Sequence, residues 1–334
     1  MTCDLPGFVD LQVNGFGGVD FNDTSVAPEA IAGALDRMLE TGVTRCLPTL
    51  ITSTLEEFRV CTRALSESGH PSIAGFHMEG PYISPEDGPR GAHRRQCVTG
   101  ATIDDFARRQ EVCDGRIRLL TLAPEVPGAI SLIEHLAGSD VRVAIGHTAA
   151  TAAQIGDAVK AGATLATHLG NGCAQMMPRH PNAIWELLAA DGVYASLIVD
   201  GHHVPRSTIK VMVRAKGPAR TILVTDAIAA AGCPPGDFTI GDVNCVLGAD
   251  GRVSLPGTPY LAGSALTMER AIQNAVRFTG VTFAEAAAMA SSIPAAYIGI
   301  PAAGSVRVEW DDERLELRIL AVRGEAGAPK ALKL

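Results

Sequence analysis

Residues Gly75–Pro81 have the sequence Gly-Phe-His-Met-Glu-Gly-Pro, a short apolar strand that ends in a single carboxylate, Glu79. Gly80 and Pro81 then break the strand, because proline cannot donate to the hydrogen-bond ladder of a sheet. A carboxylate at the end of a buried strand is costly unless a metal ion, a cation or several hydrogen-bond donors neutralise it. The stretch therefore predicts a buried strand whose carboxyl end holds one of these partners.

Three further apolar runs end in the same way. Ala144-Ile145-Gly146 is followed by His147, Leu165-Ala166-Thr167 by His168, and Leu223-Val224-Thr225 by Asp226. If these strands are parallel, their carboxyl ends lie on one face of the sheet, and we expect the four polar side chains to converge there.

Apolar runs alternate with segments of helical periodicity along most of the chain. The strand candidates are residues 7–13, 44–50, 73–78, 117–122, 141–145, 165–169, 194–199 and 221–225. The helix candidates are residues 27–41, 54–67, 102–112, 127–137, 151–161, 182–190, 205–215 and 264–279. Continuous apolarity is typical of parallel strands that are buried on both faces. Eight such repeats predict an α/β fold, a (β/α)8 TIM-type barrel, rather than an open doubly wound sheet.

Two regions break this regular alternation. A Pro/Gly/Arg-rich loop follows the third strand over residues 80–101, and a β-hairpin insertion is expected around residues 232–260. We therefore expect a barrel over residues 1–300 and a small C-terminal β segment over residues 301–334, which would form a reduced β appendage on the barrel.

Composition excludes several classes of protein. The chain has 334 residues and a formal net charge of −8, without a Lys/Arg cluster in the sequence, which argues against a nucleic-acid partner. Its eight cysteines are scattered without Cys-x-x-Cys spacing, as expected for reduced thiols. No run of about 18 apolar residues and no secretory signal pattern occurs, so we expect a soluble cytoplasmic protein that does not insert into a membrane.

Glu79, His147 and His168 are a ligand set suited to one divalent metal ion with an open position for water. Either histidine alone would more often be an ordinary polar residue, but the three together favour a metal. Zinc is the first expectation, and iron or another divalent ion fits the same ligands. Asp226 either acts as a general acid/base beside the metal or serves as a helix N-cap or loop anchor.

The ordered set of motifs around these residues resembles the N-acetylglucosamine-6-phosphate deacetylase family of the amidohydrolase superfamily. The similarity runs from about residue 6 to about residue 300. The motifs that carry it are Pro6–Gly15, His77–Pro81, Gly146–Thr148, Thr167–Leu169, Asp200–His203, Val224–Ala227 and Gly263–Met268.

The resemblance implies that Glu79, His147 and His168 bind the metal, that the metal-bound water is the nucleophile, and that Asp226 is the general acid/base. Many amidohydrolases end their first strand with His-x-His, which binds a second metal, whereas this chain has Gln12 and Asn14. Amides are poor ligands for a transition metal, so we expect a single-metal site in which Gln12 and Asn14 order water or fix a neighbouring ligand.

The resemblance also implies a substrate and an assembly. The expected reaction is hydrolysis of N-acetylglucosamine 6-phosphate, a phosphorylated amino sugar, to glucosamine 6-phosphate and acetate. The chain would form a homodimer, in which Arg179 contacts the phosphate of the other subunit's substrate. The residues that match substrate-binding positions of the family are Ala92, His93, Asn171, Gly172, Arg179, His203, Leu261, Ala262 and Gly263.

The chain departs from the family pattern at Gly172-Cys173 and over residues 175–185, and the N-terminal β strands usual in the family are missing before Pro6. These departures leave alternatives open. The enzyme could act on a different N-acyl amino sugar or on a lactone, and a non-catalytic metal-binding relative is a third possibility.

Overall fold

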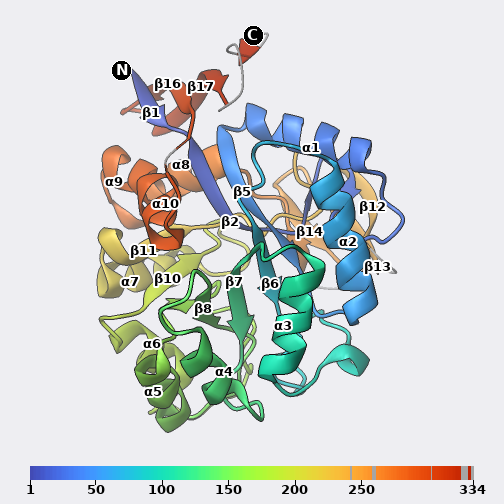
Figure 1. Cartoon of the computed structure of the whole chain (residues 1–334). Coiled ribbons are helices and arrows are strands. Elements are labelled where there is room, and N and C mark those ends of the chain that lie inside the picture. Colours follow the sequence, from blue (N-terminus) through green and yellow to red (C-terminus); the bar gives the residue numbers. More distant parts are fainter. Residues whose placement is uncertain (241–242, 258–260, 302, 325–329, 332–334) are drawn as a thin grey trace.

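The computed structural model describes residues 1–240, 243–257, 261–301, 303–324 and 330–331. Its centre is an eight-stranded sheet of parallel strands surrounded by helices, which confirms the predicted (β/α)8 barrel (Figure 1). Neighbouring strands follow one another in chain order. They are β2 (Phe8–Val13), β5 (Val43–Leu50), β6 (Phe76–Glu79), β7 (Ile117–Leu122), β8 (Arg142–Ile145), β9 (Leu165–Ala166), β10 (Tyr194–Leu197) and β11 (Thr221–Leu223).

The first and last strands of this sheet meet just beyond their carboxyl ends. An isolated parallel bridge joins Val13 to Ala227, and backbone N–H groups of Asp226 and Asn14 donate to the carbonyls of Gln12 and Ala227 at 2.8 and 2.7 Å. The barrel is therefore closed at the level where Asn14 and Asp226 leave the sheet.

Helices alternate with the strands and cover the outside of the barrel (Figure 1). Three of them begin with capping boxes, formed by Thr54 with Glu57, Thr151 with Gln154 and Thr282 with Glu285. The helices are α1 (Pro28–Glu40), α2 (Leu55–Glu67), α3 (Ile103–Val112), α4 (Ala129–Leu136), α5 (Ala152–Ala161), α6 (Ala183–Ala189), α7 (Arg206–Lys216), α8 (Met268–Thr279), α9 (Phe283–Met289) and α10 (Ser292–Ile298). The last two were not expected from the sequence.

The inside of the barrel holds a fully buried polar chain below the carboxyl ends of the strands. Nε2 of His77 lies 2.7 Å from Oγ1 of Thr121, which in turn lies 2.7 Å from Oγ1 of Thr167. Burial lowers the pKa of His77 to about 4, so this ring is neutral near pH 7. Hydrogen bonds between these three strands thus satisfy the polar groups that support the site above.

Where a β-hairpin was expected around residues 232–260, the structure has a four-stranded antiparallel sheet whose last strand extends to Ser264. Its strands are β12 (Gly236–Ile240), β13 (Val243–Leu247), β14 (Arg252–Ser254) and β15 (Leu261–Ser264), and residues 241–242 and 258–260 lie outside the described part of the chain. A small hydrophobic cluster, with Ile228, Cys245, Leu247 and Val253 among its members, attaches this sheet to the segment after β11. A two-stranded sheet of β3 (Gly15–Phe16) and β4 (Val19–Asp20) follows β2.

A second four-stranded antiparallel sheet lies where the N- and C-terminal regions come together (Figure 1). It has the order β1 (Thr2–Pro6), β16 (Ser305–Asp311), β17 (Glu316–Arg323) and β18 (Lys330–Ala331). β1 ends at Pro6 and pairs with residues 305–309 of β16, so one strand of this small sheet comes from the N-terminal residues. Residues 302, 325–329 and 332–334 of the expected C-terminal segment lie outside the described residues.

Candidate active site

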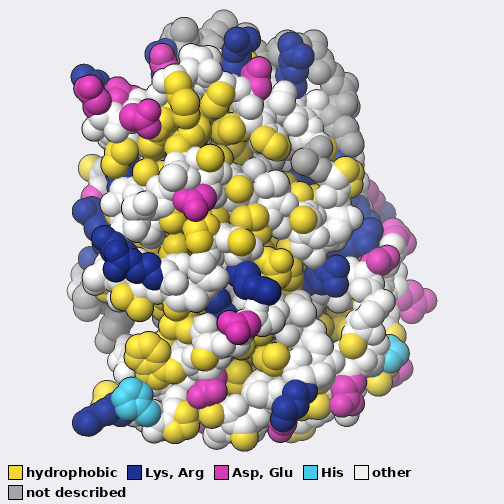
Figure 2. Space-filling model, turned by 90° about the vertical axis from the view of Figure 1, so that its left-hand side faces the viewer, with side chains coloured by type: hydrophobic (Ala, Val, Ile, Leu, Met, Phe, Trp, Pro, Cys, Tyr) yellow, Lys and Arg dark blue, Asp and Glu magenta, His cyan; other side chains and the backbone are white. Residues whose placement is uncertain are grey.

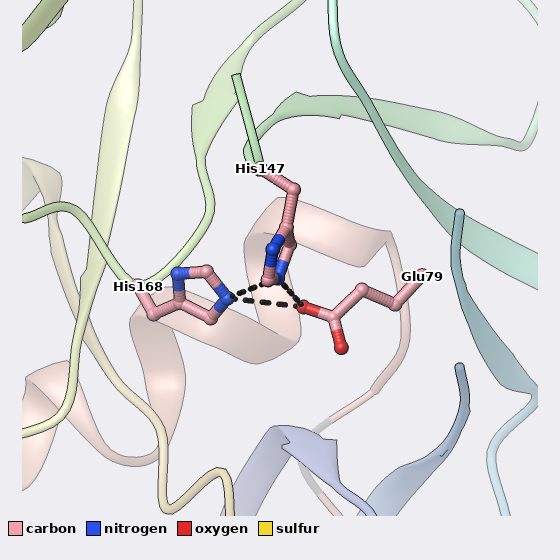
Figure 3. Close-up of side chains that lie close together, drawn as sticks. All are labelled: Glu79, His147 and His168. Atoms are coloured by element: carbon pink, nitrogen blue, oxygen red, sulfur yellow. Dashed lines mark hydrogen bonds and ion pairs between the residues drawn. The ribbon is translucent and has the colours of Figure 1, made fainter. Parts of the chain in front are cut away.

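Glu79, His147 and His168 converge at the carboxyl ends of three strands of the barrel. Glu79 is the last residue of β6, and the histidines follow β8 and β9 by two residues each. Oε1 of Glu79 lies 3.2 Å from Nε2 of His147 and 3.1 Å from Nε2 of His168, and the two Nε2 atoms are 3.0 Å apart. Figure 3 shows the carboxylate and both rings pointing toward one another. This arrangement directs three buried ligand atoms at one point.

The backbone is strained where these side chains leave the sheet. His147, His168 and Asp226 have positive φ angles of 51°, 30° and 48°, in the left-handed region that residues with a Cβ rarely adopt. Such conformations cost of order 1–3 kcal/mol each and persist where the surrounding structure enforces them, often at functional sites. Three of the four strand ends that the sequence singled out therefore carry this feature.

The donor set fits a divalent cation. Nδ1 of His147 lies 2.9 Å from the carbonyl oxygen of Pro89, so Nδ1–H donates there and Nε2 keeps its lone pair for a metal. Nδ1 of His168 is buried without a hydrogen-bond partner among the described residues. Burial alone would raise the pKa of Glu79, but its contacts with the two histidine rings hold that pKa well below its usual range. An ionised carboxylate beside two ring nitrogens is a suitable metal site.

His93 packs against this cluster from the long loop after β6. Its ring centroid is 4.3 Å from that of His147, and its Nε2 lies 4.0 Å from Oε2 of Glu79. Nδ1 of His93 accepts from the backbone N–H of Thr52, and burial followed by the charge of His147 lowers the pKa of His93 to about 3. A neutral His93 thus presents its Nε2–H toward Glu79.

Gln12 and Asn14 hold the two carboxylates of the site. Nε2 of Gln12 donates to Oε1 of Glu79 at 2.8 Å, and Nδ2 of Asn14 donates to Oδ1 of Asp226 at 2.7 Å. Of the two roles expected for these amides, fixing a neighbouring ligand is the one for which the structure provides contacts.

Asp226 lies beyond β11 and is partly buried. Desolvation, followed by the negative charge of Glu79, raises the pKa of Asp226 to about 6. Behind it, the Thr225 hydroxyl donates to the fully buried carboxyl group of Asp10 on β2. Desolvation raises the pKa of Asp10 to about 7. The Asp10–Thr225 pair thereby ties the residue before Asp226 to the first strand.

His203 lies in the loop after β10 and is oriented by Asp200. Nδ1 of His203 is 2.6 Å from Oδ2 of Asp200, whose Oδ1 accepts the backbone N–H groups of His202 and His203. The electrostatic interaction of His203 with Asp226 is one of the contributions that lower the pKa of that carboxyl.

The segment after β9 and the loop after β6 enclose His147. A Cβ added at Gly172 would lie 2.9 Å from Nδ1 of His147, and one added at Gly91, beside Ala92, would lie 3.6 Å from its Cε1. Asn171 donates its side-chain amide to the carbonyl of His168 at 3.2 Å. These residues are therefore placed around the metal cluster, as a substrate-contacting role requires.

β15 contains Leu261, Ala262 and Gly263. It lies beside the segment that follows Asp226. Ala227 and Ser264 form a bridge, and a Cβ on Gly263 would lie 2.7 Å from the Ile228 side chain. Arg179, by contrast, is exposed, and no described residue forms a hydrogen bond or ion pair with its guanidinium group. Within one chain, no contact among the described residues connects the Arg179 side chain with the metal cluster.

Sequence reasoning gave no role to Asp10 or Thr52, and it included Asp200 only as part of the Asp200–His203 motif. The Asp200–His203 pair had a local signal, since the two residues are three positions apart in a loop. Asp10 stands out as a carboxylate inside an apolar strand, but its partner Thr225 is 215 residues away. The Thr52–His93 contact had no signal in the sequence.

A barrel with one buried Glu-His-His cluster and a carboxylate at the end of the eighth strand defines the class of metal-dependent barrel hydrolases. Comparison with known families agrees with this class, because the amidohydrolase family matches residues 5–311. The chain belongs to the amidohydrolase family.

Individual relatives are more specific than the family as a whole. The chain is 34% identical over 301 residues to N-acetylgalactosamine-6-phosphate deacetylase of Escherichia coli O157:H7, covering 88% of this chain and 78% of that protein. It is 33% identical over 316 residues to N-acetylglucosamine-6-phosphate deacetylase of Bacillus subtilis (strain 168), covering 92% of this chain and 78% of that protein. The solved structure of N-acetyl-D-glucosamine-6-phosphate deacetylase from Mycobacterium smegmatis superposes with a TM-score of 0.87 at 30% identity, covering 97% of this chain and 86% of that chain.

Proposed function

We propose that this protein is a metal-dependent deacetylase that hydrolyses N-acetylglucosamine 6-phosphate to glucosamine 6-phosphate and acetate. The observation that carries the proposal is the convergence of Glu79, His147 and His168 beside Asp226, whose pKa is raised to about 6 by desolvation and by the charge of Glu79. The names of the relatives support an N-acetylhexosamine 6-phosphate as the substrate.

Each residue of the site has a part in this reaction. A divalent ion held by Glu79, His147 and His168 would polarise the amide carbonyl and activate a water molecule. The carboxylate of Asp226 accepts a proton during attack on the carbonyl carbon and returns it to the amide nitrogen as the C–N bond breaks. Asn14 holds this carboxylate in place through its 2.7 Å hydrogen bond. We take zinc as the first candidate for the ion.

For the phosphate group we propose that Arg179 acts across a homodimer. A guanidinium group can donate two parallel hydrogen bonds to a phosphate. In the sequence, Arg179 stands between two exposed hydrophobic residues. Met176 is 89% exposed and Trp185 is 48% exposed. Burial of these side chains against a second subunit would place Arg179 at the subunit interface.

This subunit arrangement can be tested by complementation. Arg179→Ala and Asp226→Asn subunits should each be nearly inactive alone at low substrate concentration. In a mixed dimer, one site has an intact Asp226 and receives Arg179 from its neighbour, so mixing should restore activity. Activity that stays at the sum of the two separate variants would exclude a shared site.

A second candidate substrate is N-acetylgalactosamine 6-phosphate, the C4 epimer, because the Escherichia coli relative carries that name. The discriminating experiment measures acetate release from both phosphorylated epimers and from unphosphorylated N-acetylglucosamine. We expect a preference of more than about a hundredfold for a phosphorylated sugar, which corresponds to about 2.7 kcal/mol. Equal activity on the phosphorylated and unphosphorylated sugars would refute the proposed phosphate site. Activity on none of the three sugars would refute the proposed function.

A further inference from the structure

A cavity of about 1020 Å³ lies between α7, α8 and the inserted sheet. Its walls come from the loop after β10, the first turns of α7, much of α8, the segment after β11 and the turn between β13 and β14. Neither the Glu-His-His cluster nor Asp226 nor His203 is among the described residues that line it. The cavity is therefore a place separate from the metal cluster.

Four cationic side chains line this cavity: Arg206 and Lys210 from α7, and Arg270 and Arg277 from α8. They come from helices that are far apart in the sequence, which is why no cationic cluster is visible in the linear chain. Figure 2 looks onto the side of the barrel that is on the left in Figure 1, where α7 lies, and shows Lys and Arg side chains across the middle of that face. A chain with a net charge of −8 thus concentrates positive charge around one cavity.

Three of these cations have no carboxylate partner. Within the described part of the chain, no acidic side chain forms an ion pair with Arg206, Lys210 or Arg270. The guanidinium of Arg206 lies over the ring of Phe278, 4.7 Å from its centroid, and Arg277 lies 3.6 Å from Oε1 of Glu316. Positive charge in the cavity is thus only partly balanced by the protein.

The two acidic residues of the cavity wall are already engaged. The Asp200 carboxylate is paired with His203 and with two backbone N–H groups, as described above. Oδ1 of Asp250 accepts the backbone N–H of Arg252. Four cationic side chains thus face two carboxylates on the cavity wall, so the wall carries a net positive charge.

The walls are also joined to one another. Nε2 of His202, in the loop after β10, lies 3.3 Å from the carbonyl oxygen of Asp250 in the turn of the inserted sheet. Gly201 packs against Phe278, because a Cβ there would lie 3.3 Å from its ring. The cavity is thus held by contacts between its walls and is more than a gap between solvated side chains.

From the charge, the volume and the contacts between its walls, we propose that the cavity is a second anion site, distinct from the metal centre, that binds a phosphomonoester of a small sugar. Pockets of roughly 300–1,000 Å³ hold whole small molecules, so the volume favours a sugar phosphate over free phosphate. Arg206, Lys210 and Arg270 would contact its phosphate group, and the wall near Phe278 would contact its sugar.

Equilibrium dialysis of the full-length, metal-loaded protein tests this site with labelled glucose 6-phosphate, inorganic phosphate and glucose as probes. The informative variant is Lys210→Ala/Arg270→Ala, and the matched control is Arg214→Ala, an exposed cation of α7 that does not line the cavity. We expect the double variant to bind one equivalent of glucose 6-phosphate at least tenfold more weakly, while the control binds as the wild type does. We also expect inorganic phosphate to bind more weakly than glucose 6-phosphate, and glucose not to bind.

Unchanged glucose 6-phosphate binding in the double variant, or no binding to the wild type, would overturn the proposal. Equal affinity for glucose would overturn it too, because charge would then play no part. Tighter binding of inorganic phosphate would overturn the assignment to a sugar phosphate. Acetate release is measured on the same samples, so a failure of the proposed deacetylase activity is seen separately from a failure of this site.

Discussion

The side-chain amide of Asn14 donates a 2.7 Å hydrogen bond to Oδ1 of Asp226 across the line where the first and eighth strands of the barrel meet. Asn14 stands at a strand end where many amidohydrolases have a metal-binding histidine. Here the residue at this position holds the proposed general acid/base instead. The site is thus organised around one cluster of ligands and one carboxylate fixed by a neutral amide.

Replacement of Asp226 by Asn should lower turnover by at least about a hundredfold, because an amide cannot accept and return the proton. The bound metal, measured by elemental analysis, should stay near the wild-type level, since Asp226 is not one of the three convergent ligands. Near-normal turnover with metal retained would contradict the assigned role.

The pH profile gives a second readout of Asp226. Desolvation raises the pKa of this carboxyl to about 6, and a bound cation would lower it. Because the ionised form is the proton acceptor, kcat/KM should fall about tenfold per pH unit below an inflection at or under pH 6. A profile that is flat down to pH 4, measured with metal still bound, would show that Asp226 is not the group that titrates in catalysis.

Gln12→Ala should weaken metal binding by about 10- to 100-fold, because the 2.8 Å hydrogen bond from Gln12 holds the ligand oxygen of Glu79. Competition with a chelator measures this affinity. Gln110→Ala is the control, since the Gln110 side chain bonds to Ile117 and Cys113 in the α3–β7 region, away from the site. If both variants bind metal equally well, Gln12 does not support Glu79.

Gly172→Ala and Gly69→Ala form a matched pair. Both glycines have left-handed backbone, with φ of 56° and 61°, so alanine should cost each about 1 kcal/mol of stability. A Cβ at Gly172 would lie 2.9 Å from Nδ1 of His147, whereas one at Gly69 meets nothing within 4 Å. Metal affinity should therefore fall only in Gly172→Ala. If neither variant loses metal affinity, the position of His147 does not depend on the space at Gly172.

Asp10→Asn should change how stability depends on pH. The pKa of Asp10 is raised from 3.8 to about 7 by burial, so the folded chain holds a proton that the unfolded chain releases between about pH 4 and 7. This group's contribution to stability is present below pH 4 and is lost as the pH rises toward 7. The Tm of Asp10→Asn relative to the wild type should therefore increase from pH 5 to pH 8.

A constant Tm difference across that range would indicate that Asp10 has an ordinary pKa. Asp191→Asn, at an exposed position after α6, serves as the control and should show little change with pH.

The barrel was predictable because its strands are continuous apolar runs with turn residues at their ends. The predicted run 117–122 coincides with β7. The predicted run 73–78 overlaps β6, which spans Phe76–Glu79. Two of the three seven-residue α-helices in the described part of the chain were missed. Phe283–Met289 and Ser292–Ile298 are each seven residues long, and the second contains Pro294, although Thr282 and Glu285 do form a capping box in front of the first.

The four side chains at strand ends were predictable for the same reason, since parallel strands bring their carboxyl ends to one face. Contacts between distant loops were not. Thr52 and His93 meet because two loops fold over the site, and no local pattern records this. The cationic cavity likewise depends on how α7 and α8 pack, which spacing in the sequence does not indicate.

The most direct test of a single-metal deacetylase is a titration of metal-free protein with zinc, with acetate release from N-acetylglucosamine 6-phosphate as the readout. Glu79, His147 and His168 are the only group of this kind found among the described residues. We predict that activity is absent without metal, rises in proportion to zinc and levels off at one equivalent per chain. Full activity in the metal-free protein, or a rise that continues to two equivalents, would contradict the account.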